Sequence, residues 1–334
     1  MTMNRQIVVK ELPQGALTQD HFELREAEMP TAPEDGIVIR TILMSIDAAN
    51  RAWMQGATYR DAVKIGDVMH TYAIGEVTES NSDKFTPGDL VATEAGWADY
   101  TAVPAKGVRK LPDMKPLSHL LSAFGIAGLT AHHGLITVGK PNAGETVVVS
   151  AAAGSVGLFV GQIAKAIGCR AVGIAGGPEK CDWVTNELGF DACVDYRDPE
   201  WHRALKVACP DGIDVYFDNV GGKVLETVLF RMNDKGRVVC CGAVSQYDSG
   251  QPVGPANLPG LIVVKRLRME GFIVFDFPDE TPKALADLQG WVTSGQIKVV
   301  EDIVEGLENA PAALIGLLAG ENRGKRMVRV GADP

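Results

Sequence analysis

The middle of the chain, from about residue 147 to residue 274, alternates short apolar runs with segments of helical period. The apolar, β-branched runs predict strands at residues 147–150, 170–176, 192–196, 213–220, 237–244 and 268–274. The segments between them predict helices at residues 156–167, 179–188, 200–208 and 222–232. Strands that are apolar along their whole length and are separated by helices are typical of a parallel sheet covered on both faces. This region therefore predicts one doubly wound α/β domain.

The first 120 or so residues show a different pattern. Short apolar runs are separated by turn sequences rich in Gly, Pro and Asp, and they lie at residues 7–12, 36–46, 75–80 and 89–103. This pattern predicts a compact, mostly antiparallel β domain with few helices. From about Ile297 the tail predicts a strand, a helix and a final strand. The sequence contains no internal repeat and no low-complexity segment.

Length and charge narrow the classes of function. A chain of 334 residues is longer than one core usually requires, so two domains are expected. The net charge is −10 and no run of five like charges occurs, which argues against a nucleic-acid or polybasic membrane role and favours a small-molecule partner. The apolar stretch at 120–135 is broken by polar residues and is shorter than the ~20 residues of a membrane span. Because the first residues lack an apolar signal segment, we expect a cytoplasmic protein.

The six cysteines show no C-x-x-C spacing, and most fall at apolar positions of predicted strands or helices. We expect them to be buried free thiols, not disulfides or metal ligands. The cysteines are Cys169, Cys181, Cys193, Cys209, Cys240 and Cys241. The six histidines lie far from any cysteine pattern, so we predict that the protein holds no metal.

One segment carries the chemistry of a ligand site: a strand at Val147, a glycine turn and a helix that ends near Gly168. The turn contains Gly154, Ser155, Val156 and Gly157. Glycine lets a cofactor approach the backbone closely, and the first N–H groups of a helix attract an anion. Such turns also occur for steric reasons alone, and Ala151 stands where the familiar fingerprint has its first glycine. The pattern predicts that a dinucleotide pyrophosphate binds here.

The second predicted strand ends at Gly176-Gly177, where an NAD-binding domain would carry an acid for the ribose 2′-hydroxyl. Without that carboxylate a 2′-phosphate is not repelled, and Lys180 in the next helix brings a positive charge. Most lysines are simply solvated charges on helix faces, and that alternative stays open for Lys180. The pattern nevertheless favours NADP over NAD.

Seven blocks in order resemble a known family: ETVVVSAAAGSVG, GQIAKAIGC, EKCDWVTNELGFDACVDY, YFDNVGG, GRVVCCGAVSQY, RMEGFIV and GENRGK. They are similar to the zinc-independent prostaglandin and leukotriene reductase, plant double-bond reductase and bacterial curcumin reductase group of the medium-chain dehydrogenase/reductase superfamily. The resemblance implies a Rossmann NADP-binding domain at residues 123–297. It also implies a GroES-like, β-rich catalytic domain formed by residues 1–122 and 298–334.

The resemblance also implies roles for individual residues. Lys180 and Tyr196 match the contacts of the NADP 2′-phosphate, and because one residue is inserted between them, Arg197 is an additional or substitute contact. Asn219, otherwise read as a turn residue before two glycines, matches a cofactor contact. The remaining matches line the nicotinamide half, largely through backbone groups: Cys241, Gly242, Ala243, Val244, Ser245, Gln246, Tyr247, Phe272, Ile273, Val274 and Asn322.

The expected reaction is the reduction of the C=C bond of an α,β-unsaturated ketone or aldehyde, as in a 2-alkenal or double-bond reductase. Hydride addition to the β-carbon moves negative charge onto the carbonyl oxygen, where hydrogen bonds can stabilise it without zinc. The resemblance assigns the catalytic role to Tyr247 as a neutral donor, in a predicted loop over residues 247–260 that would cover the substrate. An ordinary loop tyrosine is the alternative.

Three points stay open in the sequence. The segment Ser45–Arg51 reads SIDAANR and lacks the proline that is common in the family, so we expect an altered substrate pocket. His70, Tyr72 and Trp53 could line this pocket, but for these three residues simple packing is the preferred interpretation. Quinone reduction and NADPH binding without turnover are the alternative functions. By analogy with the superfamily, we expect a homodimer formed through the strand at 268–274, whose open edge needs cover.

Overall fold

The computed structural model describes residues 3–248 and 254–333, which form two compact units. The β-rich unit comprises Met1–Leu121, Glu301–Glu321 and Arg326–Pro334, and the parallel-sheet unit comprises Ser122–Val300 and Asn322–Lys325. The expected domain boundaries followed residues 122 and 297. The units divide after residues 121 and 300, and residues 322–325 belong to the parallel-sheet unit.

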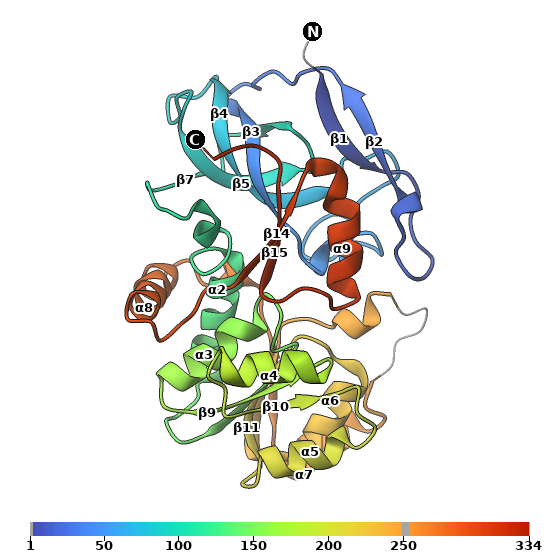
Figure 1. Cartoon of the computed structure of the whole chain (residues 1–334), viewed down its shortest axis with the longest axis vertical. Helices are drawn as coiled ribbons and strands as arrows, with labels where there is room; N and C mark the ends of the chain where they lie inside the picture. Colours follow the sequence, from blue (N-terminus) through green and yellow to red (C-terminus); the bar gives the residue numbers. More distant parts are fainter. Residues whose placement is uncertain (1–2, 249–253, 334) are drawn as a thin grey trace. The chain divides into compact units, whose positions relative to one another are not determined.

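The parallel-sheet unit contains six strands in the order β10-β9-β8-β11-β12-β13, with parallel pairing of all neighbours. Figure 1 labels three of them, β9, β10 and β11. They are β8 (Thr146–Ser150), β9 (Arg170–Ala175), β10 (Ala192–Asp195), β11 (Ile213–Asp218), β12 (Met232–Cys240) and β13 (Arg268–Gly271). The chain runs outward from β8 to one side of the sheet and from β11 to the other. Ligands of such sheets bind at the carboxyl ends of the strands where the order reverses, here between β8 and β11. The predicted doubly wound fold is confirmed.

Helices cover both faces of this sheet because strand side chains alternate between the faces. Val148, Val172 and Tyr216 point into a buried cluster with α5, α6 and α7. On the other face, a Cβ at Gly173 would lie 3.2 Å from Val184 of α4. The helical elements are α2 (Ile126–His132), η3 (His133–Gly139), α3 (Gly157–Ala166), α4 (Pro178–Asn186), α5 (Trp201–Ala208), α6 (Gly222–Leu229), η4 (Val244–Gln246), α7 (Leu258–Lys265), η5 (Val274–Asp276) and α8 (Thr281–Thr293).

The β-rich unit is built on a sheet in the order β14-β15-β3-β4-β5-β7, with β6 paired to β3 and a separate β1-β2 pair. Its strands are β1 (Asn4–Val9), β2 (Phe22–Ala27), β3 (Gly36–Ser45), β4 (His70–Ser80), β5 (Leu90–Gly96), β6 (Tyr100–Pro104), β7 (Arg109–Lys110), β14 (Glu301–Glu305) and β15 (Lys325–Arg329). The helical elements are η1 (Gln19–His21), α1 (Ala49–Trp53), η2 (Leu117–Leu120), η6 (Leu307–Asn309) and α9 (Ala310–Leu318). The pairs that join β3 to β4, β6 and β15, and β5 to β4 and β7, are antiparallel, as predicted.

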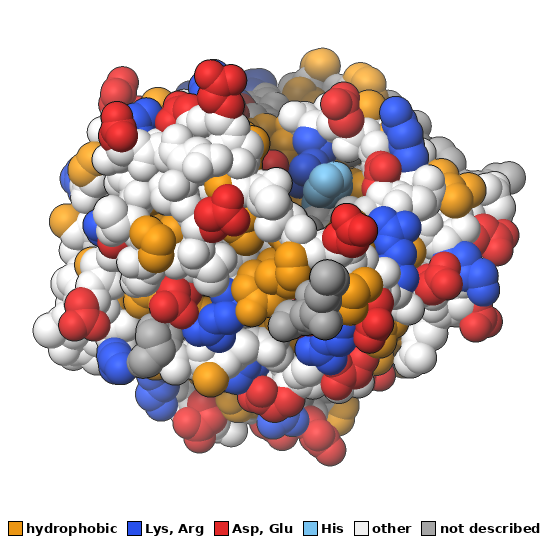
Figure 2. Space-filling model, turned by 90° about the horizontal axis from the view of Figure 1, so that it is seen from above, with side chains coloured by type: hydrophobic (Ala, Val, Ile, Leu, Met, Phe, Trp, Pro, Cys, Tyr) orange, Lys and Arg blue, Asp and Glu red, His pale blue; other side chains and the backbone are white. Residues whose placement is uncertain are grey.

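Acidic and basic side chains are intermingled on the face shown in Figure 2, and neither sign dominates it. Such mixed charge keeps a surface solvated without creating a strong field of one sign. Within residues 3–248 and 254–333, no helix combines the length and the apolar character needed to cross a membrane.

Three elements differ from the predicted ones for identifiable reasons. β12 begins at Met232, five residues early, because the polar residues 233–236 form a bulge: Ile213 pairs with Met232 and Val215 already pairs with Arg237. α7 begins at Leu258, inside the segment predicted to be a loop, and its Pro259 lies in the first turn, where a missing N–H is tolerated. β13 ends at Gly271, because Asp276 accepts a hydrogen bond from the Ile273 N–H at 2.8 Å and starts a 3₁₀ turn.

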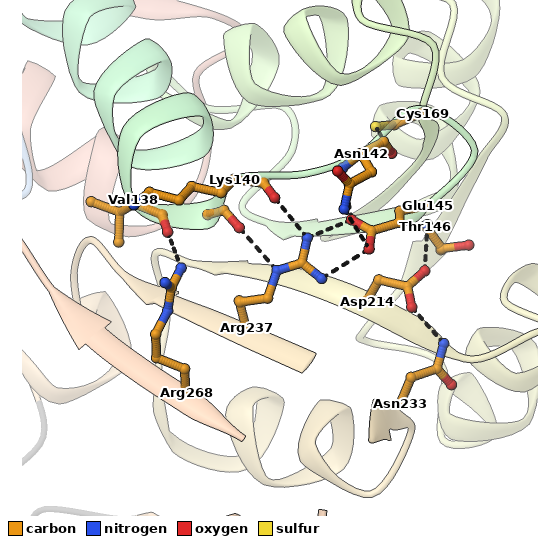
Figure 3. Close-up of polar contacts among 11 residues, drawn as sticks. Val138, Lys140, Asn142, Glu145, Thr146, Cys169, Asp214, Asn233, Arg237 and Arg268 are labelled. Carbon is orange, nitrogen blue, oxygen red and sulfur yellow. Dashed lines mark hydrogen bonds and ion pairs between the residues drawn. The ribbon is translucent and has the colours of Figure 1, made fainter. Parts of the chain in front are cut away.

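Arg237, within β12, joins the end of η3 to the residue that precedes β8 (Figure 3). Its guanidinium donates to the Gly139 carbonyl at 3.0 Å, to the Lys140 carbonyl at 2.9 Å and to Glu145 Oε1 at 3.1 Å. The final carbonyls of a helical segment have no partner within that segment, and Arg237 supplies one at the end of η3. Burial acts to raise the pKa of Glu145, but the Arg237 ion pair and the hydrogen bonds from Asn142 outweigh it, so this pKa lies below its ordinary value.

We predict that Arg237→Ala lowers the free energy of unfolding by about 2–3 kcal/mol at pH 7, because a largely buried carboxylate and two carbonyls lose a charged donor. Since the pKa of Glu145 is lowered in the folded protein, its ion pair with Arg237 stabilises the fold fully above the ordinary Glu pKa of about 4.3. This stabilisation is lost as the pH falls through the lowered pKa of Glu145. Urea unfolding of wild type and variant at pH 7 and at lower pH measures both effects.

The matched control is Arg203→Ala, because Arg203 pairs with Glu200 while its side chain is 77% exposed. It should change the stability by less than about 0.5 kcal/mol. Equal effects of the two substitutions at pH 7 would contradict this account of Arg237.

Candidate functional site

The turn between β8 and α3 allows a ligand to approach the backbone at the carboxyl edge of the sheet. A Cβ at Gly157 would lie 2.2 Å from the Ala151 carbonyl oxygen, so only glycine fits there. Gly154 donates its N–H to the same carbonyl at 2.9 Å. Ala151 has a φ of +52°, which favours glycine and costs an alanine roughly 1–2 kcal/mol. Ala151 therefore adopts a backbone conformation that glycine adopts more easily.

Ser155 supplies a test of whether an anionic group fits this turn. Its hydroxyl oxygen is buried, and within the described part of the chain no group forms a hydrogen bond with it. A buried hydroxyl without a partner is unfavourable by about 1–3 kcal/mol. The N–H groups of Ser155, Val156 and Gly157 lie at the start of α3, where helices have unsatisfied donors and a positive dipole end. The turn thus fits the pyrophosphate of a dinucleotide.

A short segment from the end of the chain, residues 322–325, is attached to this turn. Gly324 donates its N–H to the Ala153 carbonyl at 2.9 Å, and Asn322 Nδ2 donates to the Gly324 carbonyl at 2.9 Å. The Asn322 carbonyl accepts a hydrogen bond from Lys180 Nζ at 2.6 Å. The structure therefore brings two predicted cofactor residues, Asn322 and Lys180, together beside the turn. A Cβ at Gly324 would lie 2.2 Å from the Val300 carbonyl oxygen, so this glycine is required sterically.

The turn at Gly176-Gly177, between β9 and α4, gathers the other side chains predicted for the 2′-phosphate. A Cβ at Gly176 would lie 3.0 Å from Tyr196 Cε1 and 3.1 Å from Arg197 Nε. Lys180 lies in the first turn of α4, which begins at Pro178. Asp195, at the end of β10, accepts hydrogen bonds from the Gly177 N–H at 2.7 Å and the Arg197 N–H at 2.9 Å. A carboxylate is therefore present at this turn, although it belongs to the third strand and not to the second.

Asp218 organises the carboxyl ends of β8, β11 and β12. Its Oδ1 accepts hydrogen bonds from Tyr216 at 2.8 Å, Ser150 at 3.2 Å, the Gly221 N–H at 2.9 Å and the Val220 N–H at 3.0 Å. Burial raises the pKa of Asp218 above its ordinary value, although these donors act in the opposite direction.

Asn219 is held by its own hydrogen bonds to Ser150. The Asn219 N–H donates to Ser150 Oγ at 2.9 Å, and Asn219 Nδ2 donates to the Ser150 carbonyl at 2.8 Å. Ser150 ends β8, and Asn219 follows β11. The two strands at the reversal of the sheet order are thus tied together at the predicted cofactor residue.

The predicted segment Cys241–Tyr247 follows β12 and folds back on itself. Cys241 and Gly242 donate their N–H groups to the Asp218 carbonyl at 2.9 and 3.1 Å. Val244 and Ser245 donate theirs to the Asn219 and Val220 carbonyls, both at 3.2 Å, and the Gln246 N–H donates to Ala243 at 2.8 Å. The segment is therefore held at the same sheet edge as Asn219. Burial raises the pKa of the Cys241 thiol to about 12, so the thiol stays protonated at neutral pH.

Tyr247 closes this segment with its ring turned back toward it. Its phenolic oxygen accepts a hydrogen bond from the Ala243 N–H at 3.3 Å, and a Cβ at Gly242 would lie 3.5 Å from that oxygen. Burial raises the pKa of Tyr247, with a smaller opposing effect of the Ala243 N–H. The phenol is therefore neutral at pH 7 and able to donate a proton. Residues 249–253 of the predicted covering loop lie outside the described residues.

The third predicted segment, Phe272 to Val274, lies past β13. The Phe272 ring packs against Phe217 and Phe277, with centroid distances of 6.3 and 6.1 Å. A Cβ at Gly134 would lie 2.5 Å from Phe272 Cζ. Since the ring packs within this aromatic cluster, we expect any ligand to meet the backbone of Phe272, Ile273 and Val274.

The altered segment of the β-rich unit is well packed. Arg51 is buried and donates to the Gly15 carbonyl at 2.8 Å, and Asn50 Nδ2 donates to the His70 carbonyl at 2.8 Å. Trp53 is 8% exposed and lies under the Arg60 guanidinium, 4.5 Å from the ring centroid. Across the described residues, no group of three or more His, Cys, Asp or Glu side chains is placed to hold a metal ion.

Four residues that shape the site were not predicted from the sequence: Ser150, Asp195, Asp218 and Gly324. Asp218 carried a signal, because a charged residue at the end of an apolar strand and beside Asn219 requires buried partners. Asp195 is 18 residues from Gly177, and Gly324 is farther still from Ala153, so spacing alone gave no sign of these two contacts.

Two families match the chain. Residues 5–111 match the family described as the N-terminal domain of oxidoreductase, and residues 155–290 match the family described as zinc-binding dehydrogenase. The chain is 41% identical to the NADPH-dependent curcumin reductase of Escherichia coli (strain K12), over 99% of this chain and 98% of that protein. It is also 41% identical to prostaglandin reductase 1 of Rattus norvegicus, over 95% of this chain and 96% of that one.

A solved structure of CurA from Vibrio vulnificus in complex with NADPH has the same fold. It shares 38% identity with this chain at a TM-score of 0.94, and the match covers 98% of this chain and 100% of that one.

We predict that Ser155→Ala weakens dinucleotide binding by about 5- to 20-fold while leaving the ligand-free protein as stable as wild type or more so. Without ligand the Ser155 hydroxyl is buried and has no hydrogen-bond partner, so its removal should not destabilise the free protein. With ligand the hydroxyl should gain a partner, so its removal should weaken the complex. Calorimetric titration and thermal unfolding, each with and without ligand, measure the two effects. Unchanged affinity, or a marked loss of stability without ligand, would rule out this role.

Proposed function

The chain belongs to the zinc-independent prostaglandin reductase, plant double-bond reductase and curcumin reductase group of the medium-chain dehydrogenase/reductase superfamily, and we propose that it reduces the C=C bond of α,β-unsaturated ketones and aldehydes with NADPH. The observation that carries this proposal is the similarity, over nearly the whole chain, to reductases named for curcumin, prostaglandin and 2-alkenal.

The residues at the carboxyl edge of the parallel sheet fit the phosphates of NADPH. The turn at Gly154–Gly157 offers N–H groups and the unpartnered Ser155 hydroxyl to the pyrophosphate. Lys180 supplies a positive charge, and the Tyr196 hydroxyl supplies a hydrogen-bond donor, for the 2′-phosphate. Asn219 and the backbone of residues 241–247 lie at the reversal of the strand order, where they would hold the nicotinamide half.

NADPH, when bound, supplies a hydride for the β-carbon of the enone. The remaining chemistry belongs to the protein: negative charge that develops on the carbonyl oxygen needs a donor, and the α-carbon then needs a proton. We assign the donor to Tyr247, whose oxygen is positioned by the Ala243 N–H at 3.3 Å. Because burial raises the pKa of Tyr247, the phenol stays protonated across neutral pH, and its contribution is lost only above that raised pKa.

We predict that the protein oxidises NADPH in the presence of enals and enones, and that Tyr247→Phe lowers kcat/KM for an enone by about 10²- to 10⁴-fold. Absorbance of the reduced nicotinamide, followed with a panel of enals, enones and quinones, measures both. The affinity for NADPH should change little, because Phe retains the ring and loses only the hydroxyl. The rate in wild type should stay constant from about pH 6 to pH 9.

Tyr196→Phe is a matched control, because it removes a phenol that is predicted to contact the 2′-phosphate instead. It should weaken NADPH binding and leave kcat nearly unchanged. Unaltered enone turnover in Tyr247→Phe would remove Tyr247 from the mechanism. Turnover of quinones alone, or NADPH binding without any turnover, would overturn the assignment of C=C reduction.

We also propose that the protein forms a homodimer through β13, which lies at the edge of the parallel sheet. An edge strand presents unpaired N–H and C=O groups that a second copy can pair with. Light scattering after size exclusion should give twice the chain mass, and hydrogen exchange at Arg268–Gly271 should slow with increasing concentration. A single-chain mass at micromolar concentration would contradict this arrangement.

A further inference from the structure

A carboxylate lies at the turn at Gly176-Gly177, where a bound phosphate would meet its negative charge. The Asp195 carboxylate is fixed there by two N–H donors, those of Gly177 at 2.7 Å and Arg197 at 2.9 Å. A phosphate monoester brings a further charge of about −1.5 to −2 at pH 7. Lys180 Nζ, which donates to the Asn322 carbonyl at 2.6 Å, brings one positive charge, fewer than the combined negative charge of the carboxylate and a phosphate. A second cation at this turn would therefore favour a 2′-phosphate over a hydroxyl.

Arg197 has the position and the chemistry of that second cation. Its Nε lies 3.1 Å, and the Tyr196 hydroxyl oxygen 3.1 Å, from the point that a Cβ at Gly176 would occupy. Its Nη1 lies 3.9 Å from the corresponding point at Gly177. The guanidinium and the phenol thus flank a turn that has no side chains of its own.

The Arg197 guanidinium is also available for a ligand. Of the carboxylates in residues 3–248 and 254–333, none is within ion-pair distance of it, whereas the nearby Glu179 pairs with Arg323 at 3.3 Å. A guanidinium binds a phosphate through two parallel N–H groups, with more directional preference than an ammonium group.

We propose that Arg197 is a second cationic ligand of the NADPH 2′-phosphate and determines, together with Lys180, the preference for NADPH over NADH. Asp195 positions it by accepting its N–H, and Gly176 leaves the space that its guanidinium and the Tyr196 ring need. This inference rests on the proposed use of NADPH, but its test does not depend on turnover.

The test measures binding of two ligand pairs that differ only in the 2′-phosphate: NADPH with NADH, and 2′,5′-ADP with 5′-AMP. In Arg197→Ala, the dissociation constants of NADPH and 2′,5′-ADP should rise about 10- to 100-fold, and those of NADH and 5′-AMP should change less than about twofold. Arg197→Lys should recover part of the loss, because the charge remains while the paired N–H groups are absent. Added salt should weaken 2′,5′-ADP binding less in Arg197→Ala than in wild type.

Arg203→Ala is the matched control, because it removes an exposed arginine from the next helix, α5, and should alter none of the four constants. Gly176→Ala provides a second route to the same loss, since the added methyl group would displace both Tyr196 and Arg197. The proposal is overturned if Arg197→Ala binds 2′,5′-ADP as wild type does, or if all four ligands weaken equally.

The outcome for wild type separates this proposal from the proposed function. If wild type prefers 2′,5′-ADP to 5′-AMP but reduces no enone, the assignment of C=C reduction fails and the role of Arg197 stands. If wild type shows no such preference, the role of Arg197 and the preference for NADPH fail, and the enone assay alone decides C=C reduction.

Discussion

The buried carboxylate of Asp218 is the interaction on which the site depends. One of its oxygens accepts four hydrogen bonds, from Tyr216, Ser150 and the N–H groups of Val220 and Gly221, while its carbonyl accepts those of Cys241 and Gly242. Through its carboxylate and its main-chain carbonyl, Asp218 thus contacts the ends of β8, β11 and β12. These hydrogen bonds hold the three strand ends in a single arrangement.

The strand ends fixed in this way determine what the neighbouring segments can do. Asn219 is held against Ser150, and the segment after β12 folds back so that the Tyr247 oxygen meets the Ala243 N–H. The apolar core beneath supplies most of the stability, but it does not dictate where these polar groups point. The positions of these polar groups at the edge of the sheet are therefore set by a small network of hydrogen bonds, which lies above the large hydrophobic core.

Sequence predicts the parts of this protein that depend on local pattern. The apolar runs identify the six parallel strands, and the glycine turn at Gly154–Gly157 follows from its place between a strand and a helix. The start of β12 was not predictable, because the bulge at 233–236 interrupts the apolar pattern of the strand. The contact of the Asp195 carboxylate with the Gly177 turn was not predictable either, because Asp195 belongs to a different strand. The sequence correctly indicates that the second strand ends without an acid at Gly176-Gly177. It does not indicate the full charge at this turn, because Asp195 of the third strand adds a carboxylate.

The hydrogen bond between Gly324 and Ala153 has a consequence for how the protein is made. The glycine turn is synthesised near the middle of the chain, but the segment that braces it, residues 322–325, is synthesised much later. During translation the parallel sheet can form while its ligand edge is still incomplete, since domains fold as units from the N-terminal side. The glycine turn therefore gains the hydrogen bond from Gly324 only after residues 322–325 have been made.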